Sequence, residues 1–283
     1  MTAAELIAKV PMLPAPPLSV TRLLQLLVRP DADNDDIIAI VRQDAVLSAK
    51  LLALCNSALF GLATPVGSID QAVFYLGHVE IHRLIMAISF GAALSPTLPG
   101  YVIEDGELWR HSLVTAYATD KVLRAGPSVP IEPSIAYTAG LLHDLGKVVI
   151  SHALNEPNQE LIRQIMDRDG RSLLESEREV LGVDHAEIGA CLLRQWRLPD
   201  CIVEAVANHH APQIQPHPQL SAIVHVADLI AHESGASPGI ASFSARPDEA
   251  TITALGLGPV ELQRLLIETL DALEEVKGML SLA

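Results

Sequence analysis

Residues 43–61 read QDAVLSAKLLALCNSALFG and are the most informative stretch of the chain. Apolar residues recur there at helical spacing, so the stretch predicts an α-helix that ends before Gly61. Its last six residues, NSALFG, predict a tight helix end. We expect the Asn56 side chain to cap backbone groups. We also expect Gly61 to adopt a positive φ, because glycine lacks the Cβ that disfavours this conformation.

The helical pattern continues on both sides of this stretch. Upstream, residues 19–27 (SVTRLLQLL) present one apolar face made of Val20, Leu23, Leu24 and Leu27. Downstream, a short helix is predicted to end at Gly77, and residues 78–94 form the most apolar helix. Strand-like alternation is rare along the chain, so the sequence predicts an all-α fold.

The segment LSPTLPG, residues 94–100, is the clearest break, with two prolines, one glycine and no charge. We therefore predict an N-terminal helical subdomain over residues 1–95 and a second helical subdomain, ending in a C-terminal helix, over 101–283. The second is expected to contain many short helices and a loop at 234–250. Its helices are predicted at 106–125, 132–152, 158–169, 173–181, 184–196, 199–209, 217–233 and 259–281.

The composition excludes some classes of protein. Hydrophobic residues make up 49% of the 283 residues, which is enough for a sizeable core and excludes a wholly disordered chain. The net charge is −15, and residues 101–283 carry −13 of it. Because such a surface repels phosphate backbones and anionic lipid, we expect no direct binding to nucleic acid and no membrane partner.

Two further features concern the cellular location. The longest apolar run, residues 84–94, has 11 residues and is too short to span a bilayer, and no secretory signal is visible. The three cysteines, Cys55, Cys191 and Cys201, lack CxxC spacing, so we expect buried, reduced thiols. The sequence therefore predicts a cytoplasmic protein.

Histidines and carboxylates form four local patterns in the second half of the chain. Neutral imidazole and carboxylate groups suit divalent transition metals. When several come from separate helices and one carboxylate bridges, they can hold two ions about 3.5–4 Å apart. The patterns are Glu107 and His111 in ELWRHS, His143 and Asp144 in GLLHDLGK, His185 in DHAEIGACLL, and His209, His210 and Asp228 in NHHAP and HVADLIAH.

Single histidines elsewhere carry less information. A lone histidine is usually a helix cap, a surface group or a hydrogen-bonded core residue. We apply this interpretation to His78, His82, His152, His217 and His232.

The motif Q-D-x-x-L-x-x-x-L-L-x-x-x-N-S-A-x-x-G over residues 43–61, taken with residues 13–27 and 65–90, resembles the HDOD family, whose members are related to the HD-domain phosphohydrolases. The resemblance covers residues 11–235. It implies a fold in which an N-terminal helical bundle packs on an HD-like helical domain. It also implies a regulatory output role in signal transduction, with a sensory or receiver domain or another signalling protein as partner.

The metal-ligand pattern is also similar to that of HD-GYP phosphodiesterases, which cleave cyclic dinucleotides. The resemblance implies a dinuclear divalent transition-metal cofactor, with Fe or Mn favoured over Zn, Co or Ni. It assigns Asp144 and Lys147 as catalytic residues if the protein is an enzyme, and Glu107 as an additional ligand. The main ligand set is His111, His143, Asp144, His185, His209, His210 and Asp228.

One segment departs from that pattern. After the double histidine the chain reads APQIQPHPQL, without DGxGYP, and Ala186 stands where the pattern has proline. We therefore expect a signalling module that binds metal and turns over cyclic dinucleotides slowly or not at all. The alternative is a metal-dependent phosphohydrolase acting on a nucleotide or cyclic dinucleotide.

Overall fold

The computed structural model is helical, as the sequence predicts. The residues it describes contain no β-strand, and their one extended pairing is an isolated bridge between Leu98 and Ile103. The all-α class is therefore confirmed. The structure describes residues 1–10, 13, 15–29, 34–57, 60–62, 64–126, 130–169, 171–212, 219–239 and 248–280.

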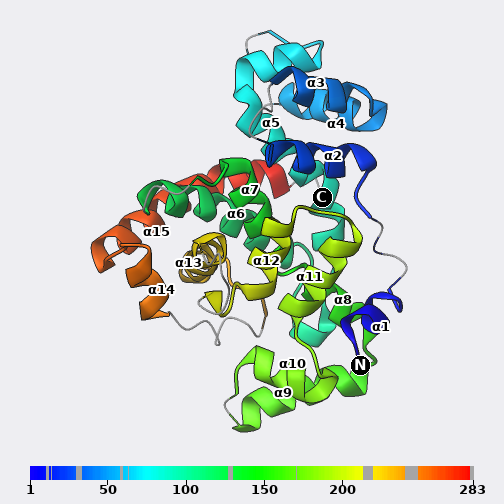
Figure 1. The fold of residues 1–283 in the computed structure, drawn as a ribbon, viewed down its shortest axis with the longest axis vertical. Helices are drawn as coiled ribbons and strands as arrows, with labels where there is room; N and C mark the ends of the chain where they lie inside the picture. The colour runs from blue at the N-terminus through cyan, green and yellow to red at the C-terminus, as the bar shows by residue number, and fades with distance from the viewer. Residues whose placement is uncertain are drawn as a thin grey trace.

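The N-terminal bundle lies at the top of Figure 1 and contains α2 (Leu18–Leu27), α3 (Asn34–Arg42), α4 (Ala45–Cys55) and the start of α5 (Ile69–Leu94). The predicted apolar face of α2 is buried. Helix α1 (Ala3–Ile7) lies apart from this bundle, against α8 (Leu145–Ala153) and α11 (His185–Gln195).

Asn56 and Gly61, the first and last residues of NSALFG, have the predicted conformations and bonds. The Asn56 side-chain amide donates to the carbonyl of Val66 at 2.9 Å, and its oxygen accepts from the Val66 N–H at 2.7 Å. Gly61 has a φ of 54°. These bonds satisfy backbone groups at the entry to α5 and attach the end of α4 to it.

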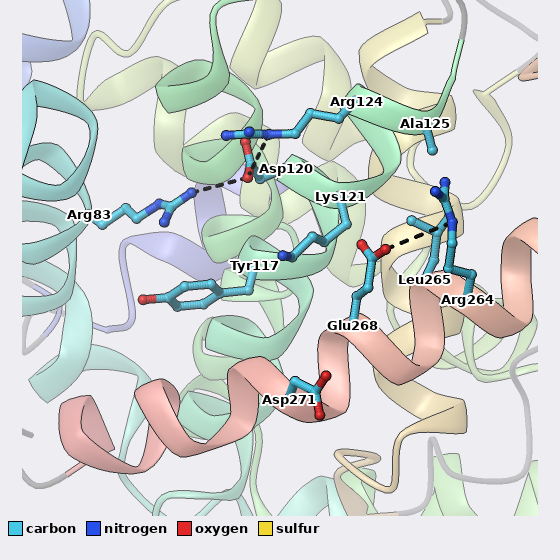
Figure 2. A pocket seen from close by; sticks show the side chains of 10 residues that line it. All are labelled: Arg83, Tyr117, Asp120, Lys121, Arg124, Ala125, Arg264, Leu265, Glu268 and Asp271. Atoms are coloured by element: carbon cyan, nitrogen blue, oxygen red, sulfur yellow. Dashed lines mark ion pairs between the residues drawn. The ribbon is translucent and has the colours of Figure 1, made fainter.

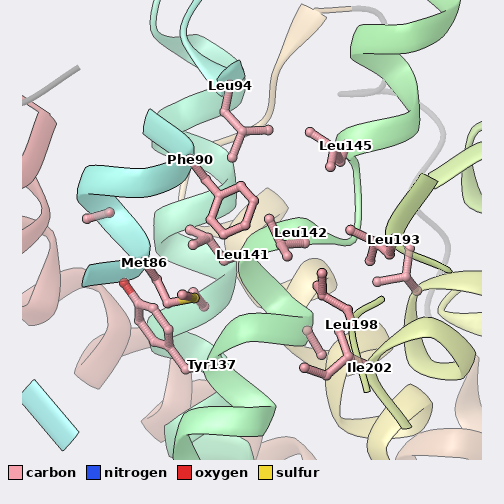
Figure 3. Close-up of a cluster of buried hydrophobic side chains, with 14 of the residues drawn as sticks. Met86, Phe90, Leu94, Tyr137, Leu141, Leu142, Leu145, Leu193, Leu198 and Ile202 are labelled. Atoms are coloured by element: carbon pink, nitrogen blue, oxygen red, sulfur yellow. The ribbon is translucent and has the colours of Figure 1, made fainter. Parts of the chain in front are cut away.

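Helix α5 connects the bundle to the rest of the protein. Gly77, with φ 78° and ψ 160°, interrupts its helical geometry where the sequence predicts a helix end. Beyond this kink Met86, Phe90 and Leu94 pack against residues from α7 (Pro133–Leu142), α8 and α11 (Figure 3). Burying each such side chain contributes about 1.5–3 kcal/mol.

By length and composition α5 could also cross a membrane, with a mean hydropathy of 1.2 over its most apolar window. Within the protein, however, 44% of that window is buried. The buried residues of α5 include Ile81, Leu84, Ile85, Met86 and Phe90, which belong to the core.

A buried ion pair also joins α5 to α6 (Glu107–Ala125). Arg83 donates to Asp120 at 3.3 Å, and Arg124 donates to the same carboxylate oxygen at 3.1 Å. The Arg83 guanidinium also lies 5.1 Å from the ring centre of Tyr117, a cation–π distance. Figure 2 shows the ion pairs of Arg83 and Arg124 with Asp120 among the residues that line a cavity between α6 and the C-terminal helix α15 (Pro259–Leu280).

The remaining helices differ from the prediction chiefly at one point. A single helix over 132–152 is wrong, because α7 ends at Leu142 and α8 begins at Leu145. The break falls on His143 and Asp144. The other helices are α9 (Glu156–Asp169), α10 (Leu173–Leu181), α12 (Asp200–Asn208), α13 (Gln219–Glu233) and α14 (Glu249–Ala254).

The cysteines and the predicted 234–250 loop differ in part from the prediction. All three cysteines are free, but only Cys55 is buried, and Cys201 is exposed on the first turn of α12. The expectation of three buried thiols is therefore wrong. Helix α14 already begins at Glu249, and residues 240–247 of that loop lie outside the described part of the chain.

A very close approach between α8 and α11 explains why the chain turns at residues 143–144. A Cβ built on Gly146 would lie 1.9 Å from the His185 carbonyl oxygen and 2.8 Å from the Gly189 nitrogen. Both atoms belong to the backbone. Only glycine lets the start of α8 lie directly on the first turn of α11, which carries His185.

Replacing Gly146 with alanine should therefore lower the free energy of unfolding by about 3 kcal/mol, because backbone atoms cannot rotate away from the added methyl group. Urea denaturation measures this change. The matched control is Gly67→Ala, where the nearest atom to an added Cβ is a flexible glutamine oxygen at 3.8 Å. Equal stability losses in the two variants would contradict this account of the contact.

Candidate metal centre

All seven main ligand candidates meet in one buried cluster. The structure brings them together from α6, the α7–α8 junction, the start of α11, the end of α12 and the middle of α13. Three groups among the described residues have ligand atoms all within 4.8 Å of one another, and two of these groups share His111. The cluster contains His111, His143, Asp144, His185, His209, His210 and Asp228.

Asp144 lies at the middle of the cluster. Its Oδ2 atom is 3.6 Å from His111 Nε2 and 3.5 Å from His143 Nε2. Its Oδ1 atom is 3.4 Å from His185 Nε2 and has no hydrogen-bond partner among the described residues. The two oxygens of one carboxylate therefore face two different sets of histidines.

The first set contains His111, His143 and Asp228. The two histidine Nε2 atoms are 3.2 Å apart, and Asp228 Oδ1 lies 3.1 Å from the first and 3.5 Å from the second. Metal bonds to imidazole nitrogen and carboxylate oxygen are about 2.0–2.2 Å long, which puts two ligands of one ion about 3–3.5 Å apart. The spacing fits a shared ion.

The second set contains His185, His209 and His210. The Nε2 atoms of His185 and His210 are 2.9 Å apart, and the rings of His209 and His210 lie 3.9 Å apart at their centres. The buried His209 Nε2 atom has no hydrogen-bond partner among the residues described. A buried, unpaired acceptor beside two other imidazoles fits a cation better than it fits a packed core.

Hydrogen bonds made by the outer ring nitrogens fix the histidine tautomers that leave Nε2 free to bind metal. A backbone carbonyl only accepts, so a histidine Nδ1 bonded to one must carry the proton, which leaves Nε2 with a lone pair toward the cluster. Three rings are held in this way, each at 2.7 Å: His111 on Ala236, His143 on Gly140, and His209 on Val206.

The ring of His185 is oriented by a carboxylate that sequence reasoning missed. Glu177 is fully buried, and its Oε2 accepts from both the His185 N–H and Nδ1 at 2.8 Å. The Tyr101 hydroxyl donates to the other oxygen at 2.7 Å. Glu177 stands among charged residues on α10, so no local signal separates it from a solvent-exposed acid.

Charges in the cluster shift the pKa values of its members. Burial alone would raise the pKa of Asp144, but Lys147 and the neighbouring histidines hold it well below its usual value. Burial would likewise raise the pKa of Asp228, which the adjacent rings of His232, His111 and His143 hold well below its usual value. Burial lowers the pKa of His209 to about 3. Neutral imidazoles and ionised carboxylates are the forms that bind metal.

Lys147 is buried and its Nζ lies 2.6 Å from Asp144 Oδ2. The predicted catalytic pair is therefore in contact. In this arrangement the lysine charge offsets the buried carboxylate, and it does not stand apart as a separate binding group for phosphate.

Glu107 does not join the cluster. Its carboxylate is exposed and accepts from the Glu104 N–H at 2.9 Å, over the first turn of α6. The i, i+4 spacing to His111 did not bring it inward, because the first residue of a helix is free to turn back over the helix start.

His82 fits the interpretation given to lone histidines, whereas His232 lies among the candidate ligands. His82 is a buried core residue whose Nε2 bonds to Thr138 Oγ1 at 2.9 Å. His232 instead belongs to the cluster, with Nε2 3.4 Å from Asp228 Oδ1. In the sequence, the i, i+4 spacing between Asp228 and His232 on one predicted helix indicates that the two side chains lie on the same face. His217 lies outside the described residues.

Comparisons with known sequences identify the family of this chain. A model of the HDOD domain matches residues 13–212. A protein of Treponema pallidum named "Uncharacterized protein" is 32% identical over 209 residues, 73% of this chain and 39% of that protein. Ribonuclease Y of Geobacter metallireducens is 30% identical over 174 residues, 60% of this chain and 25% of the enzyme. The chain thus spans well under half of the length of these relatives.

Solved structures share the fold over almost the whole chain. A "putative signal transduction protein" of Marinobacter aquaeolei matches 96% of this chain and 60% of its own, with TM-score 0.79 and 25% identity. A "putative phosphohydrolase" of Shewanella amazonensis matches 99% of this chain and 98% of its own, with TM-score 0.69 and 26% identity. An HDOD domain protein of Geobacter sulfurreducens matches 98% of this chain and 95% of its own, with TM-score 0.73 and 24% identity. Because the HDOD model covers more than half of the sequence, the chain belongs to the HDOD family.

Proposed function

We propose that this HDOD protein is a signal-transduction module that binds two divalent transition-metal ions. The observation that carries the proposal is the position of Asp144, whose two oxygens face separate sets of histidines. His111, His143, Asp144 and Asp228 would hold the first ion. Asp144, His185, His209 and His210 would hold the second. This donor set suits Fe or Mn, and also Zn, Co or Ni.

The outer hydrogen bonds and the unpaired buried atoms support the same proposal. Without a cation, the lone pairs on His111 and His143 face each other at 3.2 Å. The Nε2 atoms of His185 and His210 lie 2.9 Å apart. Divalent ions would supply the positive charge there and would act as Lewis acids toward an oxygen ligand.

Metal of this kind would give the module a rigid centre. The candidate ligands come from α6, the α7–α8 junction, α11, the end of α12 and α13, so an ion would cross-link elements that are distant in sequence. The Marinobacter relative named for signal transduction and the longer relatives favour a role beside a sensory domain, a receiver domain or another signalling protein. A direct nucleic-acid partner is not part of the proposal.

A metal-dependent phosphohydrolase is the second candidate. The full ligand set favours it, and so does the slightly exposed edge of the cluster, where the side chains of Asp228 and His232 are 12% and 10% exposed. The Shewanella relative named for phosphohydrolase activity agrees. The ion pair between Lys147 and Asp144 and the absence of DGxGYP after His210 favour the non-catalytic module.

The metal content of an Asp144→Asn variant tests the bridging role. We expect about two equivalents in the wild-type protein purified without oxygen. Each equivalent should bind at least about tenfold more weakly in the variant, because both positions lose a charged ligand. Elemental analysis after dialysis against graded metal concentrations measures this. His152→Ala is the matched control, since His152 is exposed and bonds to its own helix; an unchanged Asp144→Asn variant would contradict the bridge.

Removal of metal should destabilise the protein through linkage. At a free metal concentration of 100 times Kd, binding adds about 2.7 kcal/mol to the free energy of unfolding. Urea unfolding with and without a chelator measures the difference, and re-addition of metal should restore the original stability. A wild-type protein whose unfolding ignores the chelator would rule out a structural metal centre.

Turnover separates the two candidates. We expect slow or no hydrolysis of cyclic dinucleotides and model phosphodiesters by the metal-loaded protein, because no free cationic side chain of the cluster remains to bind phosphate. Product formation followed by chromatography tests this. Multiple turnovers that His143→Ala abolishes would establish the phosphohydrolase instead.

A further inference from the structure

His232 lies at the edge of the first set of ligands. It follows Asp228 by one helical turn on α13, and its Nε2 atom is 3.4 Å from Asp228 Oδ1. Its ring centre is 4.9 Å from that of His111. His111, Asp228 and His232 each offer a ligand atom within 4.8 Å of the others, so the third side chain points into the same space as the first two.

The distance to Asp228 argues against an ordinary hydrogen bond. N–H···O bonds in proteins measure 2.7–3.2 Å, and contacts to a charged acceptor lie at the short end of that range. The value of 3.4 Å is longer. It equals the separation between two ligands that share one ion with bonds of about 2.0–2.2 Å.

The outer nitrogen of His232 is held like those of the other ligands. His232 Nδ1 bonds to the hydroxyl oxygen of Ser237, which can accept a hydrogen bond from the ring N–H. The preceding residue, Ala236, accepts from Nδ1 of His111. The consecutive residues Ala236 and Ser237, which follow α13, therefore orient the rings of His111 and His232. Each ring has its Nε2 atom near Asp228.

We propose that His232 is an additional protein ligand of the first metal position. The inference rests on the proposed metal centre and deepens it. The first position would then have three histidines and two carboxylates, whereas the second has three histidines and only the shared Asp144. Because the first position has one more ligand and one more negative charge, it binds divalent metal more tightly and fills first.

Titration of the metal-free protein with Co²⁺, followed by visible absorption, tests this, because cobalt spectra report coordination number. The wild-type protein should bind two equivalents in two steps. In His232→Ala the tighter step should weaken at least about tenfold and change its spectrum, while the other step is retained. Added imidazole should restore the spectrum of this variant, since it can occupy the vacated position.

His232→Gln separates a ligand from a positioning residue. Glutamine can still donate a hydrogen bond to Asp228 but is a poor ligand for transition metals. If His232 is a ligand, the glutamine variant should bind cobalt as weakly as the alanine variant. Wild-type affinity and spectrum in His232→Gln would overturn the proposal.

Two controls keep the outcomes distinct. His152→Ala should titrate like the wild type, since His152 bonds to the Val148 carbonyl of its own helix, away from the cluster. If the wild-type protein itself binds no cobalt, the metal centre as a whole fails. If the wild type binds two equivalents and both His232 variants do so equally well, the centre stands and only the role of His232 fails.

Discussion

The buried Asp144 carboxylate is the constraint on which this structure depends. Moving a single ionised carboxylate out of water costs several kcal/mol unless other charges and hydrogen bonds offset it. Here Lys147 contacts one oxygen, and the neighbouring His143 together with His111 and His185 from two other helices surround both. The helix break at His143 and Asp144 and the close approach at Gly146 follow from the need to bring those groups together. The fold around Asp144 is organised by charge as much as by apolar burial.

Features set by neighbours in sequence could be predicted. The buried face of α2 and the Asn56–Gly61 turn depend on spacing and on the conformational freedom of one glycine, and both occur as expected. The seven main ligand candidates also meet, since the family resemblance supplied their order along the chain. The sequence could not reveal features that depend on tertiary contacts. The break at residues 143–144 depends on a backbone contact with α11, and the burial of Glu177 depends on Tyr101 and His185.

Glu107 and His232 show the limit of spacing as evidence. Both lie four residues from a cluster member on the same helix, yet only His232 joins the cluster. The difference is position: Glu107 begins α6 and faces water, while His232 lies in the last turn of a helix whose following residues fold back over the site. Asp228 and His232 also lie beyond residue 212, where the match to the HDOD model ends. Helix α13 thus contributes two candidate ligands from outside the matched part of the chain.

The outer hydrogen bonds of the cluster have a consequence for how the centre can change by mutation. The rings of His111, His143 and His209 are held by main-chain carbonyls, which every amino acid possesses, so no single codon change at Ala236, Gly140 or Val206 deletes the acceptor. His185 is different, because its acceptor is the side chain of Glu177. Natural variation could therefore change the proposed second metal position through one outer residue, whereas main-chain groups keep the other three rings in orientation.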